Sequence, residues 1–204
     1  RVPVEHAALA LAGHHPERVE AVIGISARSP LVPGNTDRML PSFHVEREAP
    51  EGWDKFNHSH WLNNYRDFCE FFVGQIYPEP HSTKQIQDSL EWAADGAGDT
   101  LALPVLSRPL GAGPYRIDED TYRRIACPVL LIHGAEDTLS PAETSARLAK
   151  LTRAEVHIPP GVGHAAHARF LAWTNTVVRD FLARKLGAWR PERRPRGSKR
   201  DKRV

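Results

Sequence analysis

The chain has 204 residues, of which 41% are apolar and 25% are charged, and its formal net charge is +2 at neutral pH. This length suits one domain with its own core, or one core with a small subdomain, and leaves little room for two full domains. No apolar run approaches the length of a membrane span, and two widely spaced cysteines, Cys69 and Cys127, predict no disulfide framework and a reducing, cytoplasmic location.

Residues 1–26 predict one helix followed by one strand. Ala7 to His14 has a helical pattern that Pro16 ends, and Arg18 to Ser26 is a nearly continuous Val/Ile segment, typical of a strand buried on both faces. The chain begins without Met and without a secretory signal pattern, so we expect that an N-terminal portion preceded it.

Residues 27–117 contain no convincing strand pattern. An amphipathic helix is predicted from aromatic and apolar residues spaced three or four apart (Trp61, Tyr65, Phe68, Phe72 and Ile76), and a second helix is predicted from Ser82. An insertion of this length between two strands is expected to be a helical cap that lies over the sheet's carboxyl edge. The aromatic stripe should form the core of this cap, and Trp61 and Tyr65 are also candidates for lining a substrate pocket.

Residues 118–187 return to strand and helix alternation. The strands are predicted at Pro128 to His133 and Ala154 to Pro159, and the helices from Ser140 to about Leu151 and from Ala166 to about Leu186. Together with the first strand, this pattern predicts an α/β fold with a partial doubly wound parallel sheet of about three strands.

Residues 188–204 form a basic, proline-rich tail. From Gly187 to the end there are eight Lys and Arg residues against two acidic ones, a net charge of +6. This composition cannot bury a core, so we expect a disordered tail, or a linker to a further domain. The tail has no aromatic interleaving and no groove-reading module, so we expect no nucleic-acid partner.

Two loops carry residues suited to acid–base chemistry. Asp137 follows the second predicted strand after Gly134, and His164 follows the third after Gly161-Val162-Gly163. Because ligands gather beyond the carboxyl ends of parallel strands, a carboxylate that orients a proton-transferring histidine is expected there. The alternative for Asp137 is a turn-forming residue, and His133 is expected to be a packing residue beside the site.

These loops resemble those of the α/β-hydrolase family. His133-Gly134-Ala135-Glu136-Asp137 is similar to the turn that bears the family's acid, and residues 161–164 are similar to the turn that bears its histidine. Residues 8–12 and 15–19 are similar to the helix and the strand that follow the family's nucleophile. The resemblance covers residues 7–187 and implies that residues 27–117 are the lid. It also implies a Gly-x-Ser-x-Gly elbow, or an Asp version, near Val2, where Val2 to Glu5 supply neither the nucleophile nor the glycines.

The resemblance implies that the parent protein is a serine-type esterase that acts on a small or medium apolar ester. Asp137 would orient His164, and His164 would act as general base and then acid. Alternatives are an aspartate nucleophile, as in a haloalkane dehalogenase or epoxide hydrolase, and a non-catalytic fragment or pseudoenzyme. No cofactor is implied, and the histidine pairs lack partners at the spacing of metal ligands, so no metal site is expected.

Overall fold

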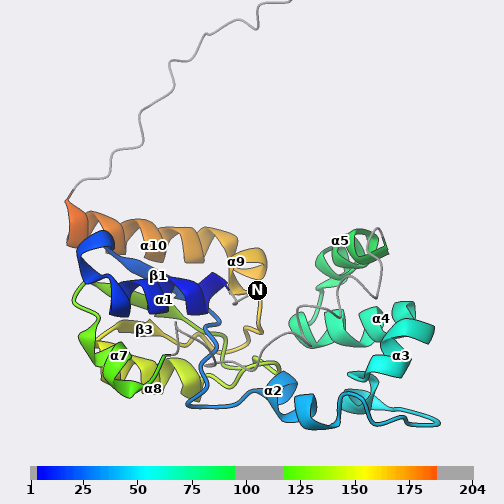
Figure 1. The fold of residues 1–204 in the computed structure, drawn as a ribbon. Helices are drawn as coiled ribbons and strands as arrows, with labels where there is room; N and C mark the ends of the chain where they lie inside the picture. Colours follow the sequence, from blue (N-terminus) through cyan, green and yellow to red (C-terminus); the bar gives the residue numbers. More distant parts are fainter. Residues whose placement is uncertain (1–3, 95–116, 188–204) are drawn as a thin grey trace, which may run out of the picture.

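The computed structural model describes residues 4–94 and 117–187, in which three parallel strands form one sheet (Figure 1). The strands are β1 (Val22–Ile25), β2 (Val129–Ile132) and β3 (Glu155–His157), in the order β1-β2-β3. Val22 lies opposite Val129, and Leu130 opposite Glu155. The predicted partial parallel sheet is confirmed. β1 begins four residues later than predicted: Arg18 ends a 3-10 turn, η1 (Pro16–Arg18), and residues 19–21 connect this turn to the strand.

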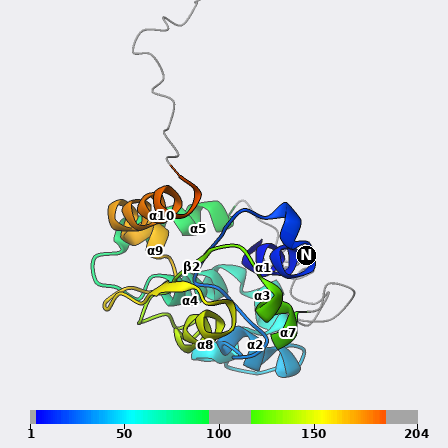
Figure 2. The same ribbon diagram turned by 90° about the vertical axis from the view of Figure 1, so that its left-hand side faces the viewer.

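Helices cover both faces of this sheet. On one side lie α1 (Val4–His14), α7 (Glu119–Arg124) and α8 (Glu143–Thr152), and on the other lie α9 (Ala166–Arg169) and α10 (Leu171–Leu186). Figure 2 shows β2 between α8 and α10. All four residues of β2 are buried, and they alternate between the two apolar clusters: Val129 and Leu131 have their contacts in the cluster with α1, α7 and α8, whereas Leu130 and Ile132 pack with α10. Burial on both faces explains why the strand is entirely apolar.

Three predicted helices begin or continue differently in the structure. The aromatic stripe lies on two helices, α3 (His58–Asn63) and α4 (Tyr65–Ile76), because Asn64 leaves the helical region with φ −135° and ψ 45°. Phe170, with φ −115° and ψ 43°, likewise separates α9 from α10. The helix predicted from Ser140 begins only at Glu143, with Ala142 as its N-cap, and the hydroxyl of Ser140 lies 3.5 Å from the carbonyl oxygen of Ala27.

Residues 35–94, here called the helical insertion, have a core of their own. Beside α3 and α4, the insertion comprises α2 (Asn35–Met39), the 3-10 turns η2 (Leu40–Ser42) and η3 (Gly52–Lys55), and α5 (Thr83–Ala94). Its centre is aromatic, and the rings of Trp61 and Phe68 stack with centroids 4.3 Å apart. Helices α3, α4 and α5 stand beside the layers of the sheet (Figure 1). Between residues 27 and 94 the only extended pairing is an isolated bridge, Ser29 to Val32.

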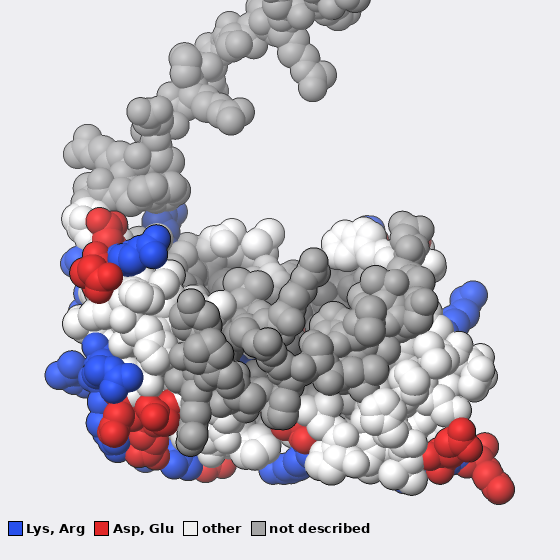
Figure 3. Space-filling view, in the orientation of Figure 1, with Lys and Arg blue, Asp and Glu red and all other residues white. Residues whose placement is uncertain are grey.

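The remaining observations concern the charges on the surface, the length of the helices and the predicted segments that lie outside the described residues. On the face that Figure 3 shows, basic and acidic side chains lie next to one another mainly at the left and along the lower edge, and most of the other described residues there are uncharged. No helix within residues 4–94 and 117–187 combines the length and apolar character that crossing a bilayer requires. The predicted disordered tail, residues 188–204, lies outside the described residues, as does the part of the predicted cap from residue 95 to residue 116.

Candidate active site

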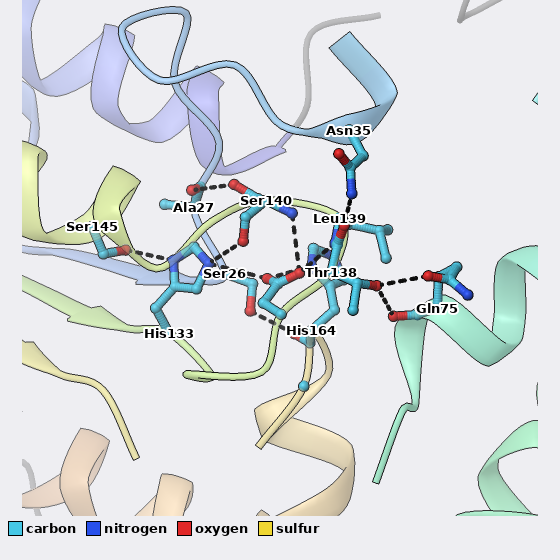
Figure 4. Close-up of polar contacts among 12 residues, drawn as sticks. Ser26, Ala27, Asn35, Gln75, His133, Thr138, Leu139, Ser140, Ser145 and His164 are labelled. Atoms are coloured by element: carbon cyan, nitrogen blue, oxygen red, sulfur yellow. Dashed lines mark hydrogen bonds and ion pairs between the residues drawn. The ribbon is translucent and has the colours of Figure 1, made fainter. Parts of the chain in front are cut away.

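The loops after β2 and β3 bring Asp137 and His164 into direct contact. Nδ1 of His164 lies 2.8 Å from Oδ2 of Asp137, although the two residues are 27 positions apart. Figure 4 shows His164 close to Ser26 and Thr138 at this edge of the sheet. Both loops leave carboxyl ends of neighbouring parallel strands, so they emerge at the same edge of the sheet. The structure therefore joins the acid and the histidine that the sequence singled out.

A close backbone approach holds the two loops together. A Cβ atom on Gly134 would lie 2.1 Å from the carbonyl oxygen of Gly163 and 2.2 Å from that of Val162, so only glycine fits at residue 134. Two residues later, the backbone N–H of Glu136 donates to the Val162 carbonyl at 2.9 Å. The loop that carries Asp137 is thus fixed against the residues that immediately precede His164.

The carboxylate of Asp137 is fully buried and accepts hydrogen bonds on both oxygens. Oδ1 accepts from the backbone N–H groups of Leu139 at 2.9 Å and Ser140 at 3.1 Å, and Oδ2 accepts from His164 and from Nε2 of His133 at 3.1 Å. Burial alone would raise the pKa of Asp137, but the hydrogen bonds from His133 and His164, the charge of His164 and the Ser140 N–H together hold that pKa well below its usual range. Asp137 is therefore ionised at neutral pH.

His133 is a second histidine on the same carboxylate. It is fully buried, its Nε2 lies 2.9 Å from the carbonyl oxygen of Ser140, and its Nδ1 lies 2.8 Å from Oγ of Ser145. Because the carbonyl and the carboxylate only accept, Nε2 carries the hydrogen and Nδ1 accepts from the Ser145 hydroxyl. His133 is buried beside the site as expected, and it also binds the Asp137 carboxylate, which the sequence analysis did not predict. Its spacing of four residues from Asp137, just after a buried strand, was the available signal.

The ring of His164 has one occupied and one open nitrogen. Its side chain is 26% exposed, and because the Asp137 carboxylate can only accept, Nδ1 carries the hydrogen and Nε2 of the neutral ring is an acceptor. Among residues 4–94 and 117–187, no group hydrogen-bonds to this Nε2. The ring thus has its tautomer set by Asp137 and an acceptor nitrogen available for a proton.

Ser26 supports His164 from the end of β1 and was missed at the sequence level. Its hydroxyl donates to the backbone carbonyl of His164 at 2.5 Å, and its φ of 53° places it in the left-handed region, which is uncommon for serine. Ser26 is only 3% exposed. A buried hydroxyl already committed to a carbonyl fixes the backbone of His164 and is poorly placed to attack a substrate. A serine directly after a buried strand was its only sequence signal.

The two aromatic candidates for a substrate pocket lie in the helical insertion. Trp61 is 6% exposed and belongs to its aromatic core. Tyr65 borders a cavity of about 960 Å³ between α4 and α5, and the residues that line this cavity include neither Asp137 nor His164. Burial raises the pKa of Tyr65 to about 12. The structure therefore does not bring these two aromatic residues into the Asp137–His164 site.

The thiols and the other histidines form no further reactive centre in the part of the chain that the structure describes. Cys69 and Cys127 are free, and burial raises the pKa of both thiols, which disfavours the nucleophilic thiolate. No group of three or more His, Cys, Asp or Glu side chains within the described ranges is arranged to hold a metal ion. Asp137 and His164 are thus the pair whose geometry suits proton transfer.

Solved structures with a similar fold are hydrolases. This chain aligns to a variant of the meta-cleavage product hydrolase CumD with a TM-score of 0.59 and 18% identity, covering 88% of this chain and 62% of that one. For the 2-hydroxy-6-oxo-6-phenylhexa-2,4-dienoate hydrolase BphD from Rhodococcus sp. strain RHA1, the TM-score is 0.56, the identity 22%, and the coverage 89% and 62%. For the esterase RhEst1 from Rhodococcus sp. ECU1013, the values are 0.62, 14%, 86% and 60%. The chain spans about three fifths of the length of these proteins, and the likeness shows the fold.

The family comparison agrees with the geometry. The comparison with curated proteins gave no significant match. The family model described as alpha/beta hydrolase fold matches residues 7–170, which is most of the chain and includes both Asp137 and His164. The parallel sheet, the two loops at its carboxyl edge and this match lead to one conclusion: the chain belongs to the α/β-hydrolase family.

Proposed function

We propose that Asp137 and His164 are the acid and the base of a nucleophile–His–Asp triad, in a serine-type hydrolase of the esterase class. The observation that carries this proposal is the 2.8 Å contact between a fully buried, ionised carboxylate and an imidazole whose other nitrogen is open. Acyl transfer needs this combination, because the base must keep one tautomer and still reach the nucleophile.

In the proposed reaction, His164 moves one proton in each half of the cycle. In acylation, Nε2 takes the proton from the nucleophile's hydroxyl as that oxygen attacks the ester carbonyl, and gives it to the departing alkoxide. In deacylation, Nε2 takes a proton from the water that attacks the acyl-enzyme and returns it to the nucleophile's oxygen as the acid is released. Asp137 stabilises the imidazolium that forms between these steps. The described residues offer Nε2 no nucleophile, so we propose that the nucleophile and the oxyanion donors come from a segment encoded upstream of Arg1.

The helical insertion is proposed to be the cap of this enzyme, and a small or medium apolar ester its substrate. Support comes from the contacts between the insertion and both catalytic loops, at Thr138 and Gly163. Esterases occur among the proteins of similar fold, alongside meta-cleavage product hydrolases. An aspartate nucleophile, as in a dehalogenase or epoxide hydrolase, would use the same two residues differently, and no cofactor is needed in either case.

A second proposal concerns the 204 residues by themselves, which we infer to be non-catalytic. Two observations favour it: no described residue is bonded to Nε2 of His164, and β1 pairs only with β2, so its other edge is open among the described residues. An open apolar edge favours aggregation or pairing with another chain. Ester turnover together with a cooperative, monomeric unfolding transition of this chain would contradict the proposal.

The site proposal is tested by His164→Ala in the protein expressed together with its upstream segment. We expect turnover of an activated ester to fall by roughly 10³-fold or more, because the nucleophile loses its base. His15→Ala, which removes a half-exposed histidine at the N-cap of η1, is the control and should keep full activity. Unchanged turnover in His164→Ala would reject the assignment. Labelling by an organophosphate reagent would distinguish a serine from an aspartate nucleophile.

The proposed setting of the enzyme follows from its chemistry. Both cysteines are free in the structure, which supports a reducing compartment, and we propose the cytoplasm. The partner is a small-molecule substrate rather than nucleic acid. Residues 188–204 are proposed to be a solvated tail or a linker to a further domain.

A further inference from the structure

One short segment of the helical insertion contacts both catalytic loops. This connector, residues 75–82, runs from the end of α4 to the start of α5. At one end, Oγ1 of Thr138 donates to the backbone carbonyl of Gln75 at 2.9 Å, beside Asp137. Further along, Oε1 of Glu79 accepts the backbone N–H of Gly163 at 2.6 Å, beside His164. The connector therefore touches the immediate neighbour of each residue of the pair.

The contact at Gly163 is tight and well supported. A Cβ on Gly163 would lie 2.4 Å from Cδ of Pro78 and 3.2 Å from Oε1 of Glu79, so the connector rests directly on the backbone before His164. The hydroxyl of the buried Ser82 donates to the backbone carbonyl of Glu79 at 2.8 Å, which fixes the turn. Arg169, just after the histidine loop, donates to the carbonyl of Pro80 at 3.1 Å.

Among the described residues, the side chain of Glu79 has one hydrogen bond, which it accepts from the backbone N–H of Gly163. It is 8% exposed, and its second oxygen, Oε2, is buried without a hydrogen-bond partner. A buried carboxylate with one unsatisfied oxygen is unfavourable for stability. Stabilisation of the fold therefore does not explain the presence of Glu79. The hydrogen bond that its side chain makes is to the loop that carries His164.

We infer that Glu79 is a positioning residue for His164, an inference that rests on the proposed function. Glu79 holds the N–H of Gly163, one residue before His164, and Ser26 holds the carbonyl of His164 itself. Asp137 then only has to orient the ring. Because Glu79 belongs to the helical insertion, the insertion takes part in fixing the backbone from which the base projects.

The first arm of the test needs no activity. In the 204-residue chain, amide hydrogen exchange at Gly163 is measured by NMR relative to Leu131 of the central strand, which reports global stability. We expect Glu79→Ala to accelerate exchange at Gly163 by about tenfold or more relative to Leu131, because the acceptor is lost. Glu79→Gln keeps an acceptor oxygen and should stay within about threefold of the original rate. Unchanged exchange at Gly163 in Glu79→Ala overturns the inference.

The matched control is Glu70→Ala. Glu70 lies on α4 in the same insertion, but it is half exposed and pairs only with Arg66. Exchange at Gly163 should not respond to its loss. If Glu79→Ala does not fold, Glu79→Met replaces it, because methionine keeps the length of the side chain without the acceptor oxygens.

The second arm uses the protein with its upstream segment and an activated ester. Glu79→Ala should lower kcat by roughly 100-fold with KM nearly unchanged, and Glu79→Gln should recover most of kcat. If His164→Ala abolishes turnover but Glu79→Ala leaves kcat intact, the positioning role is overturned. If His164→Ala retains turnover, the proposed function fails, whereas the exchange measurement still decides whether Glu79 holds the loop.

Discussion

Replacing Asp137 with asparagine tests the acid of the pair without changing its shape. The carboxylate has two acceptor oxygens, and four N–H groups donate to them: those of Leu139 and Ser140 on Oδ1 and those of His133 and His164 on Oδ2. An amide has only one acceptor oxygen. When that oxygen faces Leu139 and Ser140, the His164 N–H loses its acceptor, whereas the His133 N–H keeps the Ser140 carbonyl. At about 1–3 kcal/mol for a buried donor left unpaired, the free energy of unfolding should fall by about 1–3 kcal/mol.

Urea unfolding of the 204-residue chain measures this loss, with Asp67→Asn as the control. Asp67 also accepts from a histidine, His60, at 2.7 Å, but its side chain is 48% exposed, so its replacement should change the free energy of unfolding by less than about 1 kcal/mol. In the protein with its upstream segment, Asp137→Asn should also lower kcat by about 10⁴-fold, because His164 is released to the wrong tautomer. If Asp137→Asn unfolds within about 0.5 kcal/mol of the original chain, the four-donor account of this carboxylate is wrong.

Two further predictions use the same loops. Because the pKa of Asp137 is lowered in the folded state, the stabilisation by its carboxylate is complete above the unfolded pKa of about 3.9 and is lost as pH falls through the folded pKa. The difference in unfolding free energy between the original chain and Asp137→Asn should therefore shrink below about pH 4, which urea titrations at several pH values would measure. A difference that grows below this pH would contradict the direction of the pKa shift. Gly134→Ala should lower the free energy of unfolding by about 3 kcal/mol or more, because the new Cβ meets two carbonyl oxygens. Gly74→Ala has open space around the new Cβ inside α4 and should raise the free energy of unfolding by roughly 0.5–1 kcal/mol. Thermal unfolding measures both changes, and equal effects would contradict the close approach of the two loops.

The sequence predicted those parts of the fold that depend on local pattern. The apolar runs around Val22 and Val129 became neighbouring parallel strands, because burial on both faces requires the continuous Val/Leu/Ile composition that the sequence shows. Asp137 and His164 could be singled out because each follows a strand, and parallel strands deliver their carboxyl ends to one edge.

What could not be predicted depends on contacts between distant segments. Ser26 and His164 are 138 positions apart, and Glu79 and Gly163 are 84 apart, so no local pattern links them. The helix breaks at Asn64 and Phe170 were missed because the apolar spacing continues through both residues, and periodicity reports burial rather than backbone conformation. The role of His133 was missed because a histidine at the end of a buried strand packs well with or without a partner.

The supports of the pair come from the chain's own elements and not from a nucleophile. The Asp137 carboxylate is satisfied by His133, Leu139 and Ser140, and the backbone of His164 by Ser26, with Glu79 acting one residue earlier. None of these contacts involves the open Nε2 of His164. The Asp137–His164 geometry should therefore persist in the 204 residues alone, and any inactivity of this chain would reflect a missing reaction partner for the base rather than a displaced base.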